Sequence, residues 1–180
     1  MCNNYNSRQI CLLNQLRLLW SQHVYWTRFF ILSVAEGLAD LEPVTARLLE
    51  NPAGFSKVFA RFFGARRAAQ FEELLRQHLI IGGDLVKAAK AADAASAEAL
   101  RRQWYQNADE IAAFLAEINA CWRESEWRAM LYSHLEMTQQ EAALRIQGNY
   151  PGDIRIFGKI EAEAMEMADM MFCGLAGFCV

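Results

Sequence analysis

The chain has 180 residues, 54% of them hydrophobic and 22% charged, and a formal net charge of −3. A chain of this length and hydrophobicity buries a sizeable core, so we expect one folded domain over residues 1–180. The slightly acidic balance argues against a nucleic-acid-binding protein, which normally presents a strongly basic face.

Hydrophobic residues recur at spacings of three and four along most of the chain, which is the period of an α-helix and predicts an all-α fold. Glycines are expected to end helices and prolines to stand in first turns. With these boundaries, the expected helices cover residues 8–38, 43–63 with a restart at Asn51-Pro52, 65–93, 96–120, 125–148 and 151–176.

No segment of the sequence is expected to span a membrane. Residues 10–20 are interrupted by polar side chains and do not form a signal-peptide core. The run from Met167 to Val180 is apolar but shorter than the roughly 20 residues that a bilayer requires. The five cysteines are scattered and form no CxxC pair, which favours a reducing compartment over a disulfide framework or a thiolate zinc site. A cytoplasmic location is therefore expected.

Three histidines mark an internal repeat. His23, His78 and His134 follow one another at intervals of 55 and 56 residues, each with apolar neighbours at −4, −3, +1 and +3 and a small residue at +4. Second helices resemble one another more weakly, in LLENPAGF at 48–55 and WYQNADEI at 104–111. We expect a six-helix bundle made of three αα-hairpin repeats of about 55 residues, at approximately 9–64, 65–120 and 121–176.

The repeated histidines are the best candidates for a functional site. Their neighbours at −4, −3, +3 and +4 share a helix face with them, and that face is mostly apolar, so the rings should point inward. A single interior histidine is most simply a hydrogen-bonded core residue, but three at equivalent positions favour a site.

Neutral imidazoles that converge beside a carboxylate are suitable ligands for zinc or iron. The nearest carboxylates on the same helices are Glu141, seven residues after His134, and Asp84, six residues after His78. The candidate metal ligands are therefore His23, His78, His134, Glu141 and Asp84. Arg28 and Arg145 lie in semi-apolar stretches and are expected to neutralise buried carboxylates or to bind an anionic ligand.

Four segments together resemble a family of small bacterial helical proteins that often carries the name acetylglutamate kinase. They are QHVYWTRFFI, HLIIGGDLVKAAKAAD, WYQNADEIAAFLAEIN and MLYSHLEMTQQEAALRIQGNYPGDI. The resemblance covers about residues 16–171 and implies an all-helical fold, but no particular activity. The chain departs from the family's pattern at Gly158, where an aspartate is expected after Phe157, and in its ending FCGLAGFCV.

Kinase activity is not expected from these residues. Genuine acetylglutamate kinases have an α/β fold whose glycine-rich loops hold ATP phosphates, whereas the paired glycines Gly82 and Gly83 stand inside an amphipathic helix. No motif of a common enzyme class is present. The leading interpretation is a helical bundle whose interior histidines bind a metal ion or small ligand. The alternative is an interaction module with structural histidines that forms a homodimer through its apolar C-terminus.

Overall fold

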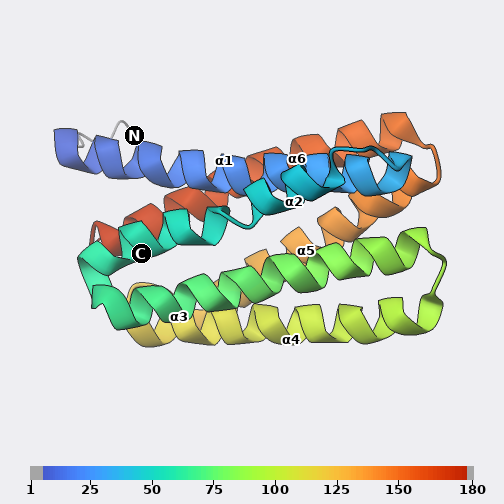
Figure 1. Ribbon diagram of the computed structural model, residues 1–180. Coiled ribbons are helices and arrows are strands. Elements are labelled where there is room, and N and C mark those ends of the chain that lie inside the picture. Colours follow the sequence, from blue (N-terminus) through green and yellow to red (C-terminus); the bar gives the residue numbers. More distant parts are fainter. Residues whose placement is uncertain (1–5, 178–180) are drawn as a thin grey trace.

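The computed structural model describes residues 6–177, and all regular structure within that range is α-helical (Figure 1). The all-α prediction is therefore confirmed. The helices are α1 (Ser7–Glu36), α2 (Leu41–Leu48), α3 (Asn51–Lys90), α4 (Ala94–Ile118), α5 (Glu124–Ile146) and α6 (Tyr150–Leu175).

Helix α3 is divided by Gly64, whose φ of 79° and ψ of 167° lie outside the helical region. Glycine adopts such a positive φ without the steric penalty that a Cβ would bring. The chain reverses direction at this point (Figure 1), so α3 consists of two arms, residues 51–63 and 65–90. The sequence placed a helix boundary at the same glycine.

The helices close into a bundle. Helix α1 lies along α6, α6 contacts α5, α5 contacts α4, and α4 runs beside α3 (Figure 1). Helix α1 also packs against α3 and α5. Because the first and last helices are neighbours, the chain does not form an open solenoid. Side chains from α1, α3 and α5 can therefore meet in a common interior.

Aromatic side chains fill much of the core. The rings of Phe59 and Phe71 stack with centroids 4.2 Å apart, and Trp122 lies 5.9 Å from Phe59. Trp127 is fully buried and meets Trp122 edge to face at 6.1 Å. Stacked and edge-to-face pairs add to the apolar area that such rings bury, so these residues anchor the packing of both arms of α3, the turn before α5 and α5 itself.

The apolar end of the chain contributes to the same core as far as it is described. Met167, Met171 and Phe172 of α6 are buried, whereas residues 178–180 lie outside the described range. Within residues 6–177 no helix is long and apolar enough to cross a membrane. Cys11 and Cys173 are free thiols and Cys121 is disulfide-bonded, which the scattered cysteine spacing did not predict. The cytoplasmic location stays a prediction.

Candidate functional site

The structure brings the three repeated histidines together. His23 of α1, His78 of α3 and His134 of α5 are all buried, with 2%, 2% and 3% of their surface exposed. The centroid of the His23 ring lies 6.3 Å from that of His78 and 5.8 Å from that of His134. The three imidazoles therefore surround one small region of the interior.

The side chain of Asn51 determines which nitrogen of His23 carries the proton. Asn51 donates from Nδ2 to the carbonyl oxygen of Leu19 at 2.9 Å, so its Oδ1 is left as an acceptor. That Oδ1 lies 3.1 Å from Nδ1 of His23. Nδ1 of the neutral ring must therefore be protonated, and Nε2 keeps the lone pair.

His78 has the same arrangement. Asn107 donates from Nδ2 to the carbonyl oxygen of Leu74 at 3.1 Å, and its Oδ1 lies 2.8 Å from Nδ1 of His78. Leu74 stands four residues before His78, as Leu19 stands four before His23. Two histidines are thus fixed in one tautomer by equivalent asparagine side chains.

His134 has a carboxylate in the corresponding place. Oε2 of Glu163 lies 3.4 Å from Nδ1 of His134, and the two side chains are 9% and 4% exposed. Within the described residues neither atom makes a hydrogen bond. Glu163 therefore stands beside His134 in the place that the asparagines take beside the other two rings, but no hydrogen bond among the described residues fixes the tautomer of His134. Unlike the asparagines, Glu163 brings a carboxyl group to the site.

Asn51, Asn107 and Glu163 were not among the residues predicted for the site. They follow one another at intervals of 56 residues, 28 or 29 positions after each histidine. The similarity of LLENPAGF and WYQNADEI already placed Asn51 and Asn107 at matching positions. The third position carries a different residue type, which hid the pattern in the sequence.

The three rings line a small cavity. Its volume, counted as the space that the centre of a water molecule can occupy, is about 20 Å³. One water needs roughly 10–15 Å³ by this measure. Most of the remaining wall is apolar and comes from α1, α2 and α3, and it includes Phe30, Ile31, Leu48, Leu79 and Val86.

The polar side chains of the wall other than the histidines have their donors engaged. Thr27 and Thr138 donate to the carbonyl oxygens of His23 and His134, both at 2.8 Å. The indole N–H of Trp104 donates to the carbonyl oxygen of His78 at 2.9 Å. Trp104 occupies the space beside Gly82, where a Cβ would stand 2.8 Å from the indole ring.

Burial keeps two of the histidines neutral. The pKa of His23 and that of His78 are each lowered from 6.5 to about 3, chiefly because burial removes the charged ring from water. Electrostatic repulsion between the ring and His134 lowers both values further, while the hydrogen bonds that the rings donate to Asn51 and Asn107 raise them. At neutral pH both rings therefore offer lone pairs without competition from protons.

No group of three or more His, Cys, Asp or Glu side chains within residues 6–177 is already arranged to hold a metal ion. An imidazole that binds zinc at about 2.0–2.1 Å has its centre roughly 3.2 Å from the ion, so two such rings lie roughly 5–6 Å apart. The ring separations of 5.8 and 6.3 Å are at or slightly beyond the upper end of this range.

The two predicted carboxylates do not line the cavity of the histidines and have other partners. Asp84 is about half exposed and pairs with Lys87 at 3.1 Å. Glu141 is buried and lies 2.6 Å from Nη1 of Arg28. Gly158, where the resembling family has an aspartate, is exposed on α6 with open space beside it.

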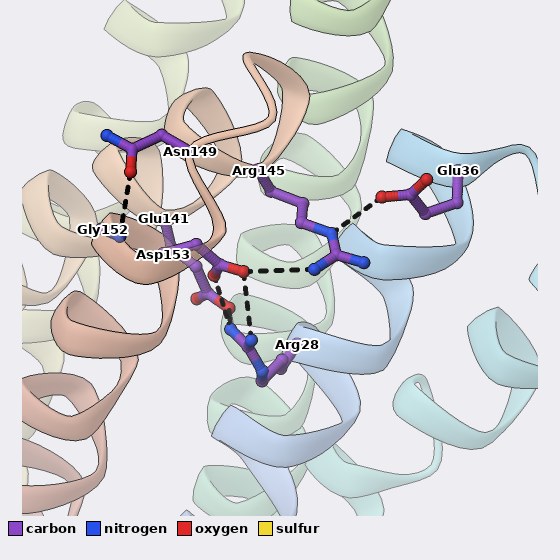
Figure 2. A network of polar contacts seen from close by, with 7 residues as sticks. All are labelled: Arg28, Glu36, Glu141, Arg145, Asn149, Gly152 and Asp153. Atoms are coloured by element: carbon purple, nitrogen blue, oxygen red, sulfur yellow. Dashed lines mark hydrogen bonds and ion pairs between the residues drawn. The ribbon is translucent and has the colours of Figure 1, made fainter.

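Arg28 and Arg145 neutralise buried carboxylates, one of the two roles expected of them. Figure 2 shows Arg28 between Glu141 and Asp153, with distances of 2.7 and 3.1 Å to the two oxygens of Asp153. Arg145 lies 3.5 Å from Asp153 and 3.0 Å from Glu36. This ionic network joins α1, α5 and α6.

The pKa of Glu141 is raised even though Arg28 lies beside it. Burial raises its pKa from 4.5 to about 7, against the opposing effect of the Arg28 charge and hydrogen bond, and nearby Asp153 raises it further. Asp153 is completely buried and shares the same arginine. Two carboxylates held by one guanidinium therefore favour protonation of Glu141 near neutral pH.

Comparisons with known proteins found no relative of this chain. No family model, no curated protein and no solved structure matches it.

Proposed function

We propose that the chain consists of three αα-hairpin repeats whose histidines together bind one divalent metal ion, zinc or iron. Each repeat supplies a histidine on its first helix and a partner for Nδ1 on its second. The observation that carries the proposal is that three imidazoles, each with Nδ1 beside an acceptor, line a single cavity.

The partners of the histidines support this proposal. A histidine that binds a metal usually donates its other ring N–H to a carboxylate or carbonyl, which fixes the tautomer and the ring orientation. Asn51, Asn107 and Glu163 occupy that place here. A structural histidine needs one such bond, but it gives no reason for three rings to line the same cavity.

The electrostatics of the cavity also favour a cation. The low pKa values of His23 and His78 leave both rings as lone-pair donors. With the donors of Thr27, Thr138 and Trp104 engaged elsewhere, the wall presents acceptors only. An electron-pair acceptor such as Zn²⁺ or Fe²⁺ matches such a wall.

His23, His78 and His134 would be the residues that hold the ion, and a zinc ion with three protein ligands would supply Lewis-acid chemistry at its remaining position. Binding requires the rings to approach one another by about 1 Å or less, to reach the separation of roughly 5–6 Å that such a site has. Asp84 and Glu141 are not part of the proposed site, because each is paired elsewhere.

Nucleotide binding is not part of the proposal. Gly82 and Gly83 lie within α3, and a Cβ at either position would contact Trp104 or Phe30. Their backbone N–H groups are in a helix interior and are not available to phosphates.

A cobalt(II) titration of metal-free protein without a histidine tag tests the proposal. We expect a visible absorption band of tetrahedral cobalt that saturates at one ion per chain, and its loss in His23→Gln, His78→Gln and His134→Gln. Asp84→Asn is the matched control and should titrate like the wild type. Far-UV circular dichroism establishes that each variant is folded. Absence of the band in the wild type, or its persistence in folded histidine variants, would reject the site.

A further inference from the structure

A groove on the surface lies between α5 and α6, and three glutamates line it. Glu126 of α5 and Glu166 of α6 are exposed, whereas Glu163 of α6 is buried. The groove has a volume of about 450 Å³ open to water, and no Lys or Arg among residues 6–177 lines it. We propose that this groove binds a linear aliphatic diamine. The proposal does not depend on the metal.

The carboxyl group of Glu163 is the observation that points to a ligand. Its side chain is 9% exposed, and its Oε2 makes no hydrogen bond within the described part of the chain. Nδ1 of His134, at 3.4 Å, lies beyond the usual range of such bonds. Buried polar groups nearly always have a partner, so one without it indicates a partner from outside the chain. Because Glu163 also lines the groove, a donor bound there can supply that partner.

An organic cation fits this groove better than a metal ion. No group of three or more His, Cys, Asp or Glu side chains among residues 6–177 is arranged to hold a metal. An alkylammonium group instead donates charge-assisted hydrogen bonds to one or two carboxylates, and its stem needs apolar contacts. Met130 and Met170 are half-buried and line the same groove. Their flexible thioether side chains can pack along an aliphatic stem.

The carboxyl groups of Glu163 and Glu126 belong to opposite ends of the groove. Helices α5 and α6 are consecutive and antiparallel (Figure 1), and Glu163 lies beside His134. Glu126 precedes His134 by eight residues, or roughly 12 Å of helix, and therefore lies toward Met170. An extended five-carbon diamine with a hydrogen bond at each end spans a similar distance. Glu126 also pairs with Arg123 at 3.1 Å, but this contact is exposed and weak.

A titration of metal-free protein with cadaverine, a five-carbon diamine, tests the proposal. The methyl resonances of Met130 and Met170, followed by NMR, should shift and saturate at one cadaverine per chain. Magnesium chloride of equal ionic strength should not prevent the shifts, and n-pentylamine, which has one ammonium group, should bind at least about tenfold more weakly. No shift in the wild type, suppression by magnesium, or equal binding of pentylamine would overturn the proposal.

Three substitutions of glutamate by glutamine locate the binding. Glu163→Gln and Glu126→Gln should each lower the affinity for cadaverine at least about tenfold, because each removes a charge-assisted hydrogen bond. Glu136→Gln is the matched control, since Glu136 is exposed on α5 and does not line the groove, and it should bind like the wild type. Unchanged affinity in Glu126→Gln, or in Glu163→Gln shown to be folded by circular dichroism, would overturn the proposal. Since no metal is present, the result is independent of the cobalt titration.

Discussion

The Oδ1 atom of Asn107 lies 2.8 Å from Nδ1 of His78, and this contact determines which nitrogen of the ring is available to the cavity. The asparagine can act in this way because its amide group is already turned by a bond to the carbonyl oxygen of Leu74. The same pair of bonds recurs at His23, Asn51 and Leu19.

Replacement of Asn107 by leucine should weaken both the fold and the proposed site. Nδ1 of His78 would be buried without a partner, and the carbonyl of Leu74 would lose the hydrogen bond that it accepts in addition to its helical one. An unpartnered buried polar atom costs about 1–3 kcal/mol of unfolding free energy. Metal affinity, measured by competition with a chelator, should fall by about 10–100-fold. Asn107→Asp keeps the acceptor and should retain more affinity than Asn107→Leu. Exposed Gln106→Leu is the control and should change neither quantity.

The ionisation of Glu141 should make stability decrease as the pH rises. Its pKa in the folded chain is about 7 against 4.5 for the ordinary carboxyl, so between these values the folded state holds a proton that the unfolded state has lost. The contribution to unfolding free energy then falls by up to about 1.4 kcal/mol per pH unit. The unfolding free energy of Glu141→Gln, measured with urea, should increase relative to that of the wild type between pH 5 and pH 8. A constant difference between the two proteins would contradict the raised pKa.

The buried histidines should make stability decrease as the pH falls, which is opposite to the effect of Glu141. His23 and His78 have pKa values of about 3 when folded and 6.5 as the ordinary value, so between these limits only the unfolded state binds their protons. Their contribution to the unfolding free energy is complete above pH 6.5. It is lost as the pH falls, by up to about 1.4 kcal/mol per pH unit for each histidine.

This loss is best measured in a Glu141→Gln background, where the opposing carboxyl is absent. The unfolding free energy should decrease from pH 7.5 to pH 5, and the decrease should be smaller after His23→Gln. If the His23→Gln variant loses stability as steeply as its parent, His23 is not neutral in the folded chain.

Arg28 should be among the most sensitive charged residues of the fold. Its side chain is 14% exposed and contacts Glu141 and Asp153, which are 2% and 0% exposed. Arg28→Met would leave two buried carboxylates with less compensation, and removal of one partner of a buried pair costs about 3–5 kcal/mol. Arg17→Met breaks a pair with Asp169 that is nearly half exposed and should cost less than about 1 kcal/mol. Thermal unfolding of both variants at one pH compares them.

Much of the fold could be predicted from local signals. Helical periodicity gave the all-α class, and Gly37, Gly64 and Gly148, each with a positive φ, mark ends of helical segments. A helix restart at Asn51-Pro52 was also expected, and in the structure α2 ends at Leu48 and α3 begins at Asn51. These features depend on residues close in sequence, which is why the sequence alone reveals them.

The site was less accessible to sequence reasoning. The histidine repeat predicted three interior rings, but their partners lie 28 or 29 residues away on other helical segments, and the third is Glu163 instead of asparagine. Glu141 shares a helix face with His134, yet its carboxylate pairs with Arg28. Spacing along one helix cannot tell whether a buried carboxylate meets a histidine or an arginine of another helix.

The most direct test of the central claim is the metal content of the chain, purified without a histidine tag and measured by mass spectrometry of the elements. The account predicts about one zinc or iron per wild-type chain and almost none in a folded His78→Ala variant prepared in parallel. Equal and negligible metal in both proteins would contradict it and would leave the three histidines as structural residues.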